Sequence, residues 1–153
     1  MNRIRTIIAL AFVMAASVFF SCEKVDTDPV VYLEVNANNI SGQWELVEWN
    51  GAALSVGTYV YLDIVRNTRT YTMYQNVDSF DNVPHIVTGA YGLDTDPELG
   101  AVISGNYAYD SGDWNHEYIV KDLTATEMTW VAKDDASFVQ KFNRVKSIPV
   151  KKD

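Results

Sequence analysis

Few residues in this chain have the type and spacing that chemistry requires. Its two histidines, His85 and His116, do not form a spacing such as His-x-x-x-His that would bring two imidazoles to one metal ion. No serine lies in a Gly-x-Ser-x-Gly turn that would present a nucleophile to a base. The single cysteine, Cys22, has no second thiol with which to form an internal disulfide. We therefore expect no metal, no cofactor and no enzymatic activity.

Two clusters of acidic residues could offer oxygen ligands, at positions 94–98 and 110–113. Calcium takes six to eight such oxygens, but neither cluster has the spacing of the twelve-residue calcium loop. Aspartate and glycine also favour ordinary turns. The aromatic residues near the second cluster, Tyr107, Tyr109 and Trp114, could stack on a sugar or pack in the core or rim.

The composition describes a single folded domain. The chain has 153 residues, of which 48% are hydrophobic and 21% charged, so most of it can build a core. Its formal charge of −8 argues against a nucleic-acid partner, because binding to phosphates requires clustered lysine and arginine.

The first 21 residues are predicted to be a signal peptide. Arg3 and Arg5 precede an apolar run at 7–20, which spans only about 21 Å as a helix and is too short for a membrane core of about 30 Å. The sequence Phe-Phe-Ser-Cys at 19–22 resembles the lipobox of bacterial lipoproteins. That resemblance implies that Cys22 is acylated, with palmitate among its chains, and attaches the protein to a membrane. An ordinary secretory signal that happens to contain a cysteine is the alternative.

Residues 22–39 have no sustained hydrophobic period, and we expect them to be a flexible tether. The lysine and acidic residues after Cys22 resemble an export signal that some Gram-negative bacteria use to send lipoproteins to the cell surface. A short charged run is also common in linkers. We expect the cell outer membrane, on either face. Removing residues 1–21 leaves 10 basic side chains against 20 acidic ones, and residues 146–153 form a basic tail.

From residue 40 onward the sequence predicts only β-structure. Runs rich in Val, Ile, Thr, Tyr and Trp alternate with Gly, Asn and Asp, and no window shows a sustained helical period. Eight strands are expected, at 43–49, 58–65, 69–75, 85–93, 101–109, 114–122, 127–133 and 137–145. Because most connections are short, neighbours along the chain should pair antiparallel. Aromatic residues on both faces favour a closed up-and-down barrel over a sandwich.

The opening of this region resembles the lipocalins and the small bacterial lipocalin-like lipoproteins. Gly42-Gln43-Trp44 matches their Gly-x-Trp motif, and the likeness extends over residues 40–145 to Gln-Lys-Phe-Asn-Arg at 140–144. The resemblance implies that a basic residue at the end of the last strand, here Arg144, packs over the Trp44 indole and closes the barrel floor.

Four further residues are candidates for a ligand site or a lid. Glu48 shares an alternation face with Trp44, so it would point into the lumen unless a β-bulge after Leu46 turns it outward. Tyr71 and Met73 are expected to face the lumen, with Arg69 or Gln75 if the phase of that strand continues. Phe80, in the polar segment 76–84, either pins this loop to the barrel or covers its mouth. We expect segments 76–84, 94–100 and 110–113 to shape the mouth.

Two functions remain open. The protein is either a membrane-anchored barrel that binds a small apolar or amphipathic ligand, or a barrel filled by its own side chains that contacts a protein or glycan through its loops. An open apolar cavity of about 300 Å³ or more would favour the first.

Overall fold

The computed structural model describes residues 28–78, 81–108 and 111–149. The predicted signal peptide, Cys22, Phe80 and Tyr109 lie outside these ranges. The described elements are one short helix, α1 (Ala37–Ile40), and the strands β1 (Gly42–Trp49), β2 (Ala52–Ala53), β3 (Val60–Val65), β4 (Thr70–Gln75), β5 (His85–Asp96), β6 (Gly100–Gly105), β7 (Tyr118–Lys121), β8 (Glu127–Ala132) and β9 (Val139–Val145). All eight predicted strands are present, and β2 is a short addition.

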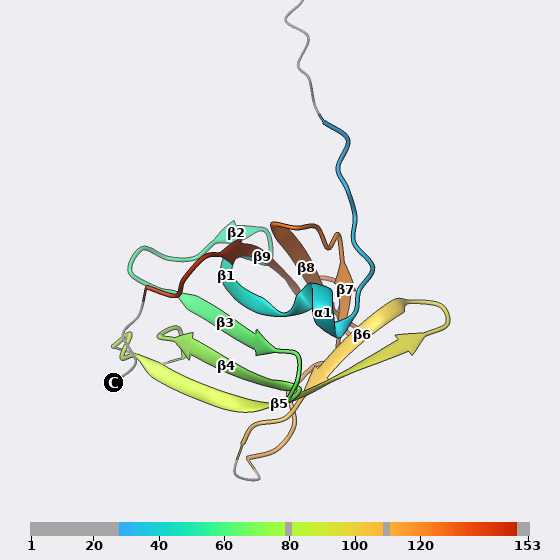
Figure 1. The fold of residues 1–153 in the computed structure, drawn as a ribbon. Coiled ribbons are helices and arrows are strands. Elements are labelled where there is room, and N and C mark those ends of the chain that lie inside the picture. The colour runs from blue at the N-terminus through green and yellow to red at the C-terminus, as the bar shows by residue number, and fades with distance from the viewer. Residues whose placement is uncertain (1–27, 79–80, 109–110, 150–153) are drawn as a thin grey trace, which may run out of the picture.

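The strands close into an antiparallel barrel. β1 pairs with β3, and from β3 onward each strand pairs with the next one along the chain. β9 then pairs with β1 and closes the barrel (Figure 1). β2 pairs only with the end of β1. The predicted all-β, eight-stranded up-and-down barrel is confirmed. Closure follows from the short connections, and it leaves neither β1 nor β9 with a long unpaired edge.

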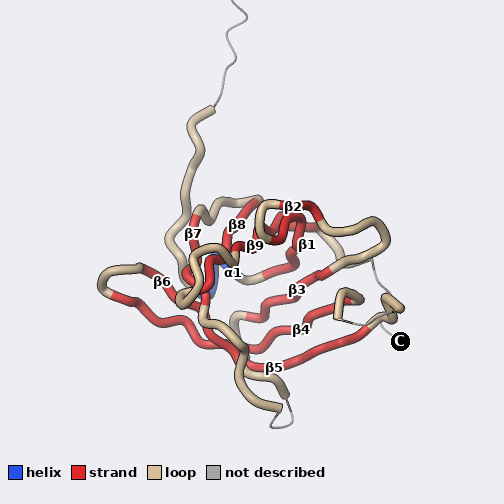
Figure 2. The backbone as a smooth tube through the Cα atoms, turned by 180° about the vertical axis from the view of Figure 1, so that it is seen from behind, coloured by secondary structure: helices blue, strands red, loops and turns tan. Residues whose placement is uncertain are grey.

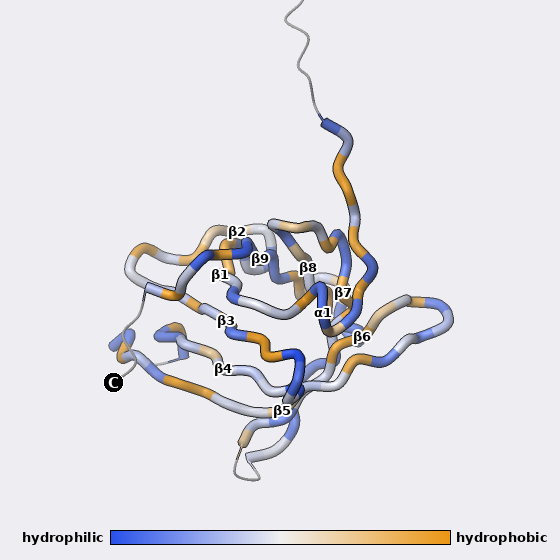
Figure 3. Tube along the Cα trace, viewed as in Figure 1, coloured by the Kyte–Doolittle hydropathy of each residue, from blue (hydrophilic) through white to orange (hydrophobic). Residues whose placement is uncertain are grey.

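Alternation along the strands determines which side chains fill the barrel. In β8, Met128, Trp130 and Ala132 are buried, and the residues between them are more exposed. Figure 3 shows the same mixture of apolar and polar residues along the other strands. The inward-facing side chains form one core with Trp44, Leu62 and Phe142, each at most 2% exposed. Their burial supplies most of the favourable free energy of folding.

Two strands end earlier or begin later than predicted. β6 ends at Gly105 rather than residue 109, and β7 begins at Tyr118 rather than residue 114. The cause lies at Asn106, whose backbone N–H donates to the Ala90 carbonyl and whose side-chain oxygen accepts from the Ala90 N–H. The Ala90 N–H is thus bonded by a side chain, and the regular pairing of β5 with β6 ends at Gly105. At their other ends, β5 and β6 form a hairpin that stands out from the barrel (Figure 2).

The predicted tether is too long at its C-terminal end. The Leu33 N–H donates to the Leu123 carbonyl at 2.7 Å, and Leu33 and Val35 pack against the core. The Asn36 side chain then caps α1 by accepting from the N–H groups of Asn38 and Asn39. Residues 33–39 therefore belong to the barrel, because they bury apolar side chains at its closed end. Among the described residues, no helix is long and apolar enough to cross a membrane.

Candidate functional site

One end of the barrel is closed by Trp44 and Arg144. Trp44 is fully buried in β1, and its indole N–H donates to the Ile40 carbonyl at 2.8 Å. The Arg144 guanidinium carbon lies 4.0 Å from the centroid of the Trp44 ring, which is within cation–π range. This is the arrangement that the family resemblance implied.

The Arg144 guanidinium also fastens the segments around this floor. Its nitrogens donate to the carbonyls of Asn39, Ser41 and Ala125 at 2.7, 2.6 and 2.9 Å. Burial lowers the pKa of Arg144, the sign expected for a cation moved out of water. Gly42 is required beside it for two reasons. Its φ is +116°, and a Cβ there would lie 2.6 Å from Arg144 Nη1.

The opposite end of the barrel contains a cavity of about 350 Å³. Trp49, Gln75 and Phe138 lie around its opening, at or beside the ends of β1, β4 and β9 that point away from Trp44. Most of its lining is apolar or aromatic. The residues that line it are Leu46, Trp49, Val60, Leu62, Met73, Gln75, Val77, Tyr107, Trp114, Asn115, His116, Tyr118, Trp130, Phe138, Gln140 and Phe142.

Trp114 sets the depth of this cavity. It lies on the connection between β6 and β7, and its indole N–H donates to the Tyr71 hydroxyl at 2.9 Å. The Tyr71 hydroxyl in turn donates to the Asn106 carbonyl at 3.1 Å. Between Trp114 and the floor, a void beside Ile64 and Tyr91 is too small to hold a water molecule. Side chains therefore fill this part of the lumen.

Glycines make room for this arrangement. A Cβ at Gly105 would lie 2.4 Å from the Trp114 ring, and one at Gly89 would lie 1.8 Å from the Asn106 carbonyl oxygen. No side chain fits at either position while the connection keeps its place. Sequence reasoning missed this role for Trp114, although two glycines inside predicted strands were a signal of close backbone or ring approach.

A nearly continuous aromatic surface forms one wall of the cavity. The Trp130 ring lies 5.8 Å from that of Trp114, 5.5 Å from Tyr118 and 4.9 Å from Phe142, measured between ring centroids. Phe138 continues this wall toward the opening, 6.2 Å from Tyr118. Such tilted contacts stabilise the rings against one another and still leave faces and edges for a ligand.

The pKa values of two tyrosines in this region, Tyr71 and Tyr118, are raised. Burial is the main cause for Tyr71, and for Tyr118 burial raises the pKa to about 12. Both hydroxyls therefore stay protonated and uncharged at neutral pH.

Polar side chains gather at the rim. Gln75 donates to the Asp78 carboxylate at 3.0 Å, and the ring Nδ1 of His116 lies 2.7 Å from Asp134 Oδ1. The rim also includes the side-chain amides of Asn115 and Gln140. Within the described part of the chain, no lysine, arginine, aspartate or glutamate lines the cavity.

The structure separates the candidate residues of the sequence analysis. Met73 and Gln75 line the cavity, and Tyr71 lies beneath it as a support for Trp114. Of the two directions left open for Glu48, the structure shows the outward one, so Glu48 is not part of the ligand site. The register between β1 and β9 shifts between Leu46 and Glu48, which is the bulge considered as the alternative, and Glu48 pairs instead with Lys141 at 2.8 Å.

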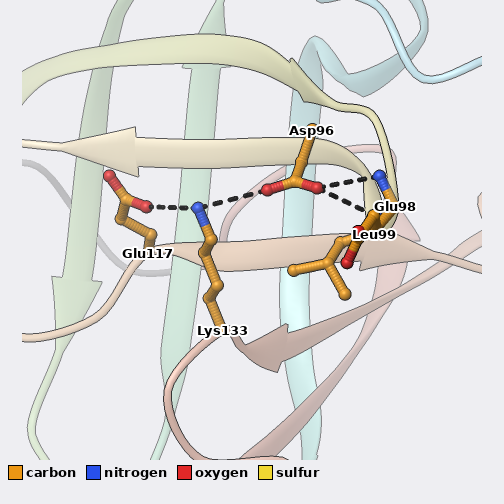
Figure 4. A network of polar contacts seen from close by, with 5 residues as sticks. All are labelled: Asp96, Glu98, Leu99, Glu117 and Lys133. Atoms are coloured by element: carbon orange, nitrogen blue, oxygen red, sulfur yellow. Dashed lines mark hydrogen bonds and ion pairs between the residues drawn. The ribbon is translucent and has the colours of Figure 1, made fainter.

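The predicted mouth segments are only partly correct. Val77, in segment 76–84, lines the cavity, whereas no residue of 94–100 does. Segment 94–100 forms the turn of the β5–β6 hairpin. There, Asp96 accepts from the N–H groups of Glu98 and Leu99, and these bonds, with Lys133 nearby, lower the pKa of Asp96 (Figure 4).

The acidic clusters do not form a metal site in the described residues, where no three His, Cys, Asp or Glu side chains are placed to hold an ion. Asp113 instead takes part in an isolated bridge to Asn106. His85 lies 3.5 Å from Asp78, away from His116 and its partner Asp134.

The closed barrel, its Gly-x-Trp opening and the arginine over that indole make the fold lipocalin-like, as predicted. No protein-family model and no curated protein matches this chain. Among solved structures, the chain is similar to the crystal structure of a lipocalin-like protein from Bacteroides uniformis. The two sequences are 16% identical, the alignment covers 69% of this chain and 97% of the other, and the TM-score is 0.49. This likeness concerns the fold alone.

Proposed function

We propose that this protein binds a small apolar or amphipathic molecule inside its barrel while attached to the bacterial cell envelope through acyl chains on Cys22. The observation that supports binding is the cavity of about 350 Å³, which exceeds the lower limit of about 300 Å³ typical of small-molecule sites. A barrel of eight strands has an interior that is either filled by side chains or able to hold one small ligand. Here side chains fill the part between Trp114 and the floor, and the cavity lies beyond Trp114.

The binding proposal is tested by searching for a ligand and then blocking the cavity. Protein purified gently from its own host is analysed by native mass spectrometry, and we expect a bound small molecule. Met73→Trp places an indole inside the cavity, and Thr72→Trp places the same group on the opposite face of β4. We expect Met73→Trp to abolish ligand retention and Thr72→Trp to preserve it. Protein that always emerges empty would favour a barrel that acts through contacts with a larger partner.

The attachment proposal rests on the lipobox-like sequence before Cys22 and is tested separately. Two or more acyl chains hold a protein on a membrane, whereas one gives only reversible binding. Because Cys22 is the proposed site of acylation and of cleavage, Cys22→Ala is expected to leave an unprocessed precursor without acyl chains. If this variant is still cleaved after residue 21 and sediments with the outer membrane, the attachment proposal is wrong.

A further inference from the structure

We propose that the cavity selects an uncharged, ring-containing ligand, with its ring against the aromatic wall and its polar group at the rim, and that it discriminates against anions such as fatty acids. This inference rests on the proposed binding function. It concerns which chemical class of molecule the cavity accepts.

Charge is the first basis for this selectivity. Moving an ionised group from water into an apolar site is unfavourable unless a partner of opposite charge receives it. No lysine or arginine lines the cavity in the described residues. The carboxylates behind its rim, Asp78 beyond Gln75 and Asp134 beyond His116, repel an anion further.

The lysine beside this rim is already engaged. Lys133 precedes Asp134, but its ammonium lies 3.4 Å from the carboxylates of both Asp96 and Glu117. Figure 4 shows the lysine between these two acids. Lys133 does not line the cavity. A ligand carboxylate would have to compete with two fixed carboxylates for the same ammonium group.

Shape and wall chemistry favour a ring over a long chain. Trp114 closes the cavity from below through its bond to Tyr71, so an extended chain cannot continue toward the barrel floor. The wall of Trp114, Trp130 and Tyr118 offers aromatic faces and edges to a flat molecule. Aromatic pairs gain about 0.5–1.5 kcal/mol beyond the burial of their area.

The rim specifies the position of the polar group. The Gln140 amide faces the cavity from β9 beside Trp49 and Trp130, its paired neighbours, and Asn115 and His116 approach from the connection before β7. These groups can donate to or accept from a hydroxyl, carbonyl or amide. A cation finds aromatic faces here, but no lining carboxylate compensates for its loss of water. An uncharged group therefore suits the rim best.

The test uses one ring with three substituents. The neutral dye N-phenyl-1-naphthylamine is bound to the wild-type barrel and detected by energy transfer from the tryptophans that line the cavity. It is then displaced with 1-naphthalenemethanol, 1-naphthylmethylammonium or 1-naphthoate, which are neutral, cationic and anionic. We expect the neutral alcohol to compete at least about tenfold better than the anion, with the cation between them. A straight-chain alcohol of equal octanol–water partition coefficient should compete less well than the ring.

A charge variant tests the cause. Met73→Lys places an ammonium group in the cavity and should shift the preference toward 1-naphthoate by about tenfold or more. Thr72→Lys, on the opposite face of β4, adds the same net charge and should leave the order unchanged. If wild-type protein binds naphthoate as well as or better than the alcohol, if it prefers the cation, or if Met73→Lys does not change the order, the inference is wrong.

The two proposals fail differently. If the dye does not bind, or binds equally to the wild type and Met73→Trp, the proposed binding function itself fails. If Met73→Trp blocks the dye but the anion or the straight chain competes best, only the selectivity is wrong.

Discussion

The floor of the barrel allows a quantitative test of its packing. Trp44 is fully buried, so Trp44→Leu should destabilise the fold by about 3 kcal/mol through lost contacts and the cavity that remains. Arg144→Met removes three hydrogen bonds to carbonyls from a partly buried cation, and we expect a loss of about 2 kcal/mol. The cation–π contact at 4.0 Å is partly desolvated and should contribute about 1–2 kcal/mol of coupling.

Because each single variant already loses the contact between Trp44 and Arg144, their effects should not add. The double variant is expected to lose about 3–4 kcal/mol rather than about 5 kcal/mol. A single domain has a stability of about 5–15 kcal/mol, so the four proteins of the cycle should remain measurable. The assay is urea unfolding followed by circular dichroism, which does not depend on the tryptophan that is replaced.

Two controls show whether the coupling is specific. Trp49→Leu removes a tryptophan at the other end of β1, and its combination with Arg144→Met should be additive to within about 0.5 kcal/mol. Arg144→Lys retains a positive charge but not the planar fork, so its coupling to Trp44 should be smaller than that of Arg144→Met. If Trp44→Leu and Arg144→Met are also additive, the cation–π explanation of the floor is refuted.

Three further predictions concern the cavity and the outer face of the barrel. Gly105→Ala should displace the Trp114 ring and lower stability by about 1–3 kcal/mol, measured by urea unfolding, because the added Cβ would lie 2.4 Å from that ring. Burial raises the pKa of Tyr118 from 10.0 to about 12. The contribution of the uncharged Tyr118 hydroxyl to the free energy of unfolding should therefore be fully present below pH 10 and be lost as the pH rises toward 12. The urea midpoint of Tyr118→Phe should fall less over that interval, and an equal fall would contradict the assignment. Glu48→Gln should change stability by at most about 1 kcal/mol and leave dye affinity unchanged, because Glu48 pairs with Lys141 on the outer face. A large change in dye affinity would show instead that Glu48 faces the lumen.

The sequence predicted the parts of this fold that local pattern controls. The alternation of Met128, Trp130 and Ala132 with more exposed residues is visible without a structure, and the same rule located all eight long strands. Short connections then predicted the order of pairing. The position of Arg144 over Trp44 came from the family motif, because no local pattern links two residues a hundred positions apart.

The parts that the sequence did not predict depend on tertiary contacts. A bulge after Leu46 has no hydrophobic pattern by which the sequence could reveal it, so the sequence left the direction of Glu48 open. The end of β6 and the start of β7 were misplaced because the residues between them alternate like a strand, although the side chain of Asn106 takes the Ala90 N–H and the regular pairing ends there. The cavity likewise required the position of Trp114, which is set by a hydrogen bond to Tyr71 on a strand 43 positions earlier.

The two ends of the barrel are stabilised by different means, and this difference bears on binding. At the closed end, a charged side chain bonds three carbonyls and covers a fully buried ring, so opening it would break several strong contacts together. At the open end, the depth of the cavity depends on Trp114. Its indole N–H donates to Tyr71, its backbone N–H donates to the Gly105 carbonyl, and its ring packs against the rings of Tyr71, Tyr118 and Trp130. These contacts are made by uncharged groups, and they lie on the side of the barrel where a ligand would enter. The depth of the cavity is therefore set by the connection between β6 and β7, whereas the floor is set by Trp44 and Arg144.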